Sequence, residues 1–172
     1  ERKINKKKIL TITLILTLAL SLFAAIPAQA ATEPEIEAAI QAGLAWLATM
    51  QRVDGSWGSY YTADTGLCVL KFIDAAAEFD TTWDDPSYIY HQNVVDGLDL
   101  LFARAVIAAI GVQAAGDPDS DGDGIGVTFT ASYAGYETSI ALMAIAATQT
   151  PAKVVSVAGS AVDGWTYDQV VE

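Results

Sequence analysis

Basic residues are scarce in this chain of 172 residues, which has nine Lys and Arg against twenty-one Asp and Glu and a net charge of −12 at pH 7. Five of the nine basic residues lie within the first eight positions. Beyond residue 30 only four basic residues remain beside twenty acidic ones, which gives a net charge of −16. Such a charge repels phosphate backbones and anionic lipid head groups, so we expect no nucleic-acid partner.

Cysteine and histidine each occur once, at Cys68 and His91. A single cysteine excludes an intrachain disulfide, even in an oxidising compartment. Cys68 lies in the apolar stretch 67–70, where we expect a small buried hydrophobe rather than a reactive thiolate. We expect His91 to be a loop residue.

The first thirty residues have the order of a secretion signal: a basic segment, an apolar run over 9–26, Pro27, and the small-residue triplet 28–30. We therefore predict a signal peptide at 1–30, a protein that is secreted or held in the cell envelope, and no membrane span after cleavage. The alternative is an uncleaved anchor, since about eighteen apolar residues can just span a bilayer.

Four helices are expected after residue 31, at about 33–50, 64–79, 93–110 and 136–148, from apolar residues at helical spacing. Val127 to Thr130 has the composition of a short extended segment. The last residues, 168–172, have the pattern of an N-cap and first turn. Because of that ending, and because the chain begins at Glu1, we expect the domain at 31–172 to be incomplete.

An internal repeat is visible when residues 64–70 are aligned with 137–143: an acid, a threonine, a small residue and then matched apolar positions. The turn Asp163-Gly164-Trp165 likewise resembles the earlier turn at 54–57. Repeated helix pairs are typical of solenoids and closed toroids, in which one hairpin cannot bury its own core.

The segment 43–58 resembles the QW-type repeat of squalene cyclases and protein prenyltransferases. In that repeat an aromatic–aliphatic pair is followed by a glutamine and then by glycine-x-tryptophan. The matching residues here are Trp46, Leu47, Gln51, Asp54, Gly55 and Trp57, and a weaker second copy has Gly164 and Trp165. The resemblance implies an all-α fold, with helical hairpin repeats forming a partial α/α toroid and an acidic loop inserted at 117–126. We expect the motif to be structural, with the glutamine bonding backbone groups and the tryptophan covering the turn.

The family's catalytic residues are not found in this chain. The Asp-x-Asp-Asp string of the cyclases does not occur, and no Asp, Cys and His set stands in the context of a prenyltransferase zinc site. We therefore expect an exported, non-catalytic repeat module that binds a protein, a glycan or an envelope component. The alternative is a cyclase- or prenyltransferase-type enzyme whose catalytic residues lie in missing downstream sequence.

The acidic loop alternates carboxylates with small residues, and its candidate metal ligands are Asp117, Asp119, Asp121 and Asp123. Converging carboxylates and a glycine bend are typical of calcium loops. The loop departs from an EF-hand, since its twelfth position, Thr128, is not a bidentate glutamate. The two interpretations of this loop are a weak calcium site and a solvated linker.

Overall fold

The structure, a computed structural model, describes residues 31–116, 119, 122–130 and 133–172. The predicted signal peptide at 1–30 and two of the candidate calcium ligands, Asp117 and Asp121, lie outside the described residues. The described residues 31–39 belong to one unit of the chain, and residues from 40 onward belong to a second. In the first, Thr32 donates from its backbone N–H and its hydroxyl to the Glu35 carboxylate, both at 2.8 Å.

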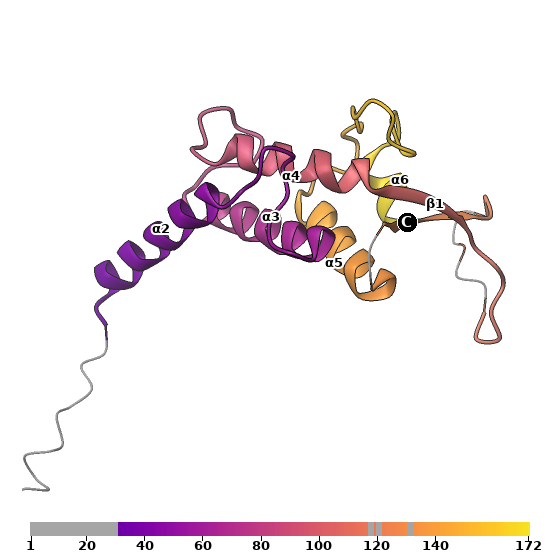
Figure 1. Cartoon of the computed structure of the whole chain (residues 1–172), viewed down its shortest axis with the longest axis horizontal. Helices are drawn as coiled ribbons and strands as arrows, with labels where there is room; N and C mark the ends of the chain where they lie inside the picture. The colour runs from indigo at the N-terminus through magenta and orange to yellow at the C-terminus, as the bar shows by residue number, and fades with distance from the viewer. Residues whose placement is uncertain (1–30, 117–118, 120–121, 131–132) are drawn as a thin grey trace, which may run out of the picture. The chain divides into compact units, whose positions relative to one another are not determined.

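The described elements follow one another as helices interrupted by a pair of strands (Figure 1). In chain order they are α2 (Glu33–Thr49), α3 (Tyr61–Glu78), α4 (His91–Ala103), β1 (Ala105–Ala109), β2 (Ile125–Phe129), α5 (Ala134–Ala147) and α6 (Tyr167–Val171). The helix start expected at 168–172 is present as α6, with a capping box between Thr166 and Gln169.

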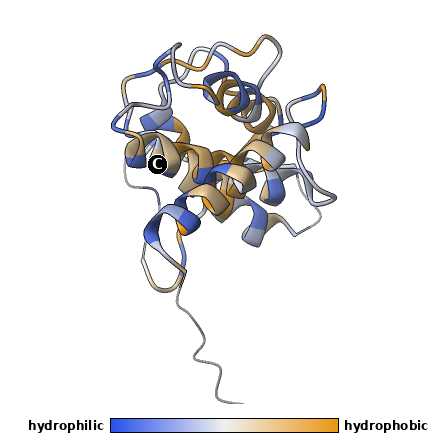
Figure 2. Cartoon of the chain, turned by 90° about the vertical axis from the view of Figure 1, so that its left-hand side faces the viewer, coloured by the Kyte–Doolittle hydropathy of each residue, from blue (hydrophilic) through white to orange (hydrophobic). Residues whose placement is uncertain are grey.

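Helix α3 lies at the centre of the unit 40–172, packed against α4 and α5 (Figure 1). It approaches both helices closely at glycines: a Cβ on Gly66 would lie 2.8 Å from Ile140 Cγ2, and one on Gly97 would lie 2.5 Å from Val69 Cγ2. In Figure 2 the hydrophobic stretches gather on the helices, and hydrophilic residues mark many loops and helix ends. The most deeply buried side chains of this core include Val69, Phe72, Val94, Leu98, Leu101, Phe102, Ala141, Ala144 and Ile145.

The all-α fold predicted from the sequence is wrong, because the third helix does not continue to residue 110. It ends at Ala103, and β1 follows, paired antiparallel with β2 in a register that sets Ala105 against Phe129 and Ala109 against Ile125. The fold is therefore mixed α/β, and a toroid made of helices alone does not describe it. The acidic loop is the connection of this β-hairpin rather than an insertion between two helices.

Residues 105–109 form a strand because they pair with β2. The β-branched pair Val106 and Ile107 favours extended backbone, and a segment some twenty residues away supplies the hydrogen-bonding edge. At the base of the hairpin the Thr130 N–H donates to the Arg104 carbonyl at 2.8 Å. Helical periodicity up to residue 105 carries no information about such a non-local partner.

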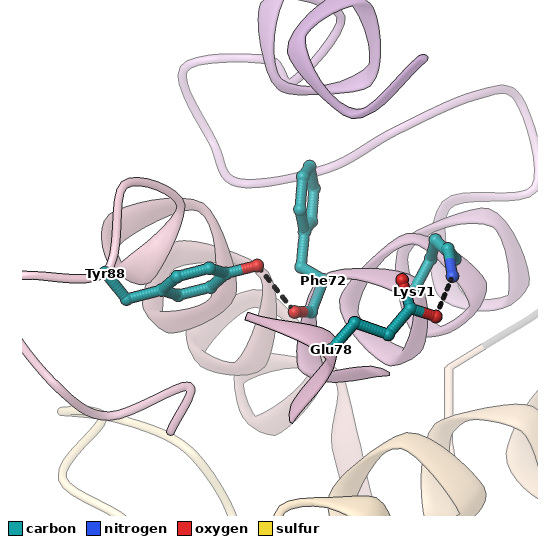
Figure 3. Close-up of polar contacts among 4 residues, drawn as sticks. All are labelled: Lys71, Phe72, Glu78 and Tyr88. Carbon is teal, nitrogen blue, oxygen red and sulfur yellow. Dashed lines mark hydrogen bonds and ion pairs between the residues drawn. The ribbon is translucent and has the colours of Figure 1, made fainter. Parts of the chain in front are cut away.

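The segment between α3 and α4 is held by its aromatic rings. The Tyr88 hydroxyl donates to the Phe72 carbonyl at 2.7 Å, beside the surface ion pair of Lys71 and Glu78 at 3.6 Å (Figure 3). Tyr90 lies 4.9 Å from Phe72, centroid to centroid. Burial raises the pKa of the Tyr88 hydroxyl, which therefore stays protonated and donating over the physiological pH range.

Candidate binding surface

Helices α3 and α5 begin with the same contact between a carboxylate and a tyrosine backbone. At α3 the Asp64 carboxylate accepts hydrogen bonds from the N–H groups of Ser59 and Tyr60, at 2.8 and 2.9 Å. At α5 the Glu137 carboxylate accepts from the N–H of Tyr133 at 3.1 Å. A carboxylate in the first turn that binds an N–H at the helix start stabilises the start in the manner of a capping box.

The next residue of each helix also has the same role. The Thr65 hydroxyl oxygen accepts from the backbone N–H of Trp57, and the Thr138 hydroxyl oxygen accepts from that of Phe129, both at 3.1 Å. The acid and the threonine of the aligned repeat thus make equivalent contacts in both copies. As a result the two tyrosines that precede the helices have equivalent backbone positions.

Four tyrosine rings are exposed at these two helix starts. Tyr60, Tyr61, Tyr133 and Tyr136 are 52%, 43%, 62% and 61% exposed. The rings of Tyr60 and Tyr133 are 6.0 Å apart, centroid to centroid, and so join α3 to α5. Tyrosine has an apolar body and a polar tip, and aromatic rings gathered on a surface mark sites of interaction.

Two arginines lie against one of these four rings, that of Tyr61. The guanidinium carbons of Arg52 and Arg104 are 5.1 and 5.7 Å from the centre of the Tyr61 ring, which is within cation–π distance. Arg104 is fixed by its neighbours: Nε donates to the Thr62 hydroxyl at 3.0 Å, and Nη2 donates to the Thr130 carbonyl at 2.7 Å. Its position therefore depends on the base of the β-hairpin.

Arg52 is exposed and is less fully bonded than Arg104. Its Nη1 donates to the Ser56 hydroxyl at 3.3 Å, and within the described part of the chain its Nε and Nη2 have no hydrogen-bond acceptor. A guanidinium carries five N–H donors in a planar fork suited to a carboxylate. We call the six residues Arg52, Tyr60, Tyr61, Arg104, Tyr133 and Tyr136 the tyrosine–arginine surface.

Two residues of the QW-type motif, Gln51 and Trp57, fix the turn between α2 and α3. Gln51 Nε2 donates to the carbonyls of Gly55 and Asn93, at 3.1 and 3.0 Å, and Gln51 Oε1 accepts from Asn93 Nδ2 at 2.7 Å. The Trp57 indole N–H donates to the Leu47 carbonyl at 2.8 Å. The glutamine thus ties the turn to the first turn of α4, while the tryptophan ties it to the end of α2.

The Asp54 carboxylate accepts from the N–H and hydroxyl of Ser56, at 3.1 and 2.6 Å, and these bonds lower the pKa of Asp54. Trp46 is 62% exposed and takes no part in the turn. In the second copy Gly164 has a φ of +86°, against +85° at Gly55, while Trp165 is half-buried. The two turns therefore share their backbone conformation but not their tryptophan packing.

We expect Gln51→Ala to lower the free energy of unfolding by about 2 kcal/mol, because two carbonyls and one amide lose their partner. Gln92→Ala is the matched control: the Gln92 side chain is exposed and, among the described residues, bonds only Asp96, so its loss should cost less than about 0.5 kcal/mol. Urea denaturation measures both. Equal losses in the two variants would show that the Gln51 contacts do not stabilise the turn.

Of the four candidate calcium ligands, two are described. Asp119 accepts from the N–H groups of Gly122 and Gly124, at 3.0 and 2.8 Å, and Asp123 accepts from that of Ile125 at 2.8 Å. Over residues 31–116, 119, 122–130 and 133–172 no three acidic, His or Cys side chains form a group that could hold a metal ion. The calcium site remains a prediction from the sequence.

Asp119 shapes the loop by bonding two backbone amides, so Asp119→Ala should lower the melting temperature in EDTA by about 4 °C or more, the shift expected for about 1 kcal/mol. Calcium titration with a thermal melt then tests the metal. A rise in melting temperature with calcium that Asp119→Ala abolishes supports the predicted site. An unchanged melting temperature contradicts it, and leaves the loop as a linker ordered by its own hydrogen bonds.

Cys68 is partly buried on α3, and burial, with a smaller effect of Asp64, raises the pKa of its thiol to about 12. The thiolate is the nucleophile, so at pH 8 we expect the folded protein to react with a disulfide reagent about a thousand times more slowly than the unfolded chain. A spectrophotometric thiol assay with and without urea measures the ratio. Equal rates would mean that the thiol is accessible and its pKa normal.

No family model matches the chain, and no match was found among curated proteins or solved structures. A proposal about the function of this chain therefore depends on its own geometry. None of the helices in the described part of the chain is long and apolar enough to cross a bilayer.

None of the six residues of the tyrosine–arginine surface was predicted from the sequence as a site residue. One signal for two of them was present: extending the aligned repeat four residues toward the N-terminus sets Tyr60 against Tyr133. Arg104 had no such signal, because it was expected to lie within a helix.

Proposed function

We propose that the chain is a non-catalytic binding module of an exported protein, and that the tyrosine–arginine surface holds its partner, a protein, a glycan or an envelope component. The observation that carries the proposal is the exposure of four tyrosine rings at two adjoining helix starts, where Tyr60 contacts Tyr133 and two arginines lie against Tyr61. The export of the protein rests on the signal-like first thirty residues.

The composition supports a binding role for this surface. Arg52 and Arg104 are two of only four basic residues beyond position 30, and both lie against Tyr61. The surface is also preorganised, because Asp64, Glu137 and the hydrogen bonds of Arg104 hold its backbone and one guanidinium in place. Preorganised side chains lose little conformational entropy on binding.

The test is cosedimentation of the purified chain with cell envelopes and with insoluble extracellular polymers. We expect binding that the double variant Tyr60→Ala, Tyr133→Ala loses at least tenfold. Trp46→Ala is the matched control, since Trp46 is as exposed as Tyr133 and lies outside the surface. If the double variant binds as well as Trp46→Ala, or if the unmodified chain binds nothing, this function is wrong.

A further inference from the structure

We infer that the partner of the tyrosine–arginine surface is a polysaccharide that contains carboxylated sugars. This inference rests on the proposed binding function and specifies its ligand. The tyrosines indicate a ligand made of sugar rings, and the arginines indicate that it has carboxylates.

The tyrosines fit a chain of sugar rings. A sugar ring has one face of C–H groups, which packs on an aromatic face, and a rim of hydroxyls, which bonds polar groups. Tyr60 and Tyr133 offer ring surface from two helices at a centroid distance of 6.0 Å, so one extended ligand can contact both. Tyr136, in the first turn of α5, adds a third exposed ring near the start of that helix.

The arginines specify a carboxylate. Arg52 has two nitrogen positions, Nε and Nη2, with no acceptor in the described residues, and these form one edge of the guanidinium fork. That edge matches the two oxygens of a carboxylate in a charge-assisted, bidentate pair. Tyr61 lies within cation–π distance of both guanidiniums and holds them close to the rings.

The net charge restricts the ligand further. The chain beyond residue 30 has a net charge of −16, which opposes a dense polyanion. At physiological ionic strength charges more than about 8 Å away are largely screened. The carboxylates at the surface, Asp64 and Glu137, already accept tyrosine N–H groups, so the unbonded edge of Arg52 is the part that favours an isolated carboxylate. A polymer in which carboxylated sugars are separated by neutral ones therefore suits the surface better than a heavily sulfated one.

A protein partner fits less well. Stable protein interfaces bury about 800 Å² on each partner and have an apolar centre. The six residues defined here are tyrosines and arginines with polar tips, and none is aliphatic. We therefore treat a protein partner as an outcome of the test.

The experiment measures binding by calorimetry to soluble hyaluronan, polygalacturonate and alginate, to the carboxyl-reduced form of each, and to dextran. We expect polygalacturonate and alginate, which carry a carboxylate on every sugar, to bind less tightly than hyaluronan, in which carboxylated and neutral sugars alternate. Hyaluronan should bind at least tenfold more tightly than its own reduced form. Arg52→Gln should remove that difference, because it deletes the unbonded guanidinium edge. Lys71→Gln, which removes one positive charge from an exposed site on α3, should leave it unchanged.

Two further results separate the inference from the proposed function. Equal binding to the acidic and reduced polymers overturns the carboxylate, but the surface would still bind glycans. No binding to any polymer, together with envelope binding that Tyr60→Ala, Tyr133→Ala loses, overturns the glycan and favours a protein partner. Melting curves of every variant establish that the chain remains folded, and Arg52→Lys, which restores the charge without the fork, should recover little affinity.

Discussion

Replacing Gly55 with alanine should lower the free energy of unfolding by about 3 kcal/mol or more, the sum of a left-handed backbone in a non-glycine residue and overpacking. Gly55 has a φ of +85°, and an added Cβ would lie 2.2 Å from the carbonyl oxygen of Asp96 in α4. Relief of that contact requires the turn to move away from α4. Such a movement would break the hydrogen bond from Gln51 to Asn93.

Gly164→Ala is the control that isolates the steric contribution. Gly164 has a φ of +86° and open space where the Cβ would lie. Only the backbone penalty of about 1 kcal/mol then applies. Urea denaturation of both variants measures the difference, and equal losses would show that the turn is not packed against α4 as described.

Truncation of Trp57 to alanine should have an effect of about 4 kcal/mol, typical of a large buried aromatic. Trp57 is 2% exposed, its ring lies 5.9 Å from that of Phe72, and its indole N–H donates to the Leu47 carbonyl. The variant loses apolar burial and the indole hydrogen bond to that carbonyl, which keeps only the N–H of Met50 as a donor. Both losses fall between α2, α3 and α4.

Trp46→Ala makes the same substitution in the same motif at an exposed position, and we expect a change within about 0.5 kcal/mol. Chemical denaturation followed by circular dichroism measures both variants without relying on tryptophan emission. A loss at Trp46 as large as that at Trp57 would mean that α2 is held through its exposed tryptophan. The motif would then have a different structural basis from the one seen here.

Local patterns in the sequence predicted the helices well, because helical periodicity and turn residues act over a few positions. The turn with Gln51, Gly55 and Trp57 is one such case, and the repeated acid and threonine of α3 and α5 are another. The β-hairpin is the counterexample. The segment 105–109 becomes a strand only because Ile125–Phe129 pairs with it, and no local pattern reveals a non-local partner.

Local sequence patterns could not predict the tyrosine–arginine surface, for a similar reason. Arg52 lies near the start of the turn between α2 and α3, Tyr61 starts α3, and Arg104 follows α4. Only the packing of these segments brings the three residues together. The residues Gln51 and Trp57 of the QW-type motif instead stabilise the turn between α2 and α3. The sequence therefore predicted the residues that stabilise the turn more clearly than the exposed residues of the candidate binding surface.

The first turn of each repeated helix contains the carboxylate that bonds the backbone of its tyrosine. The acid that bonds the Tyr60 backbone belongs to α3, and the one that bonds the Tyr133 backbone belongs to α5. Duplication of a single helical unit would therefore copy the aromatic ring together with its support. A surface of this kind can lengthen by tandem gene duplication, one ring at a time, without new residues having to arise to hold each ring.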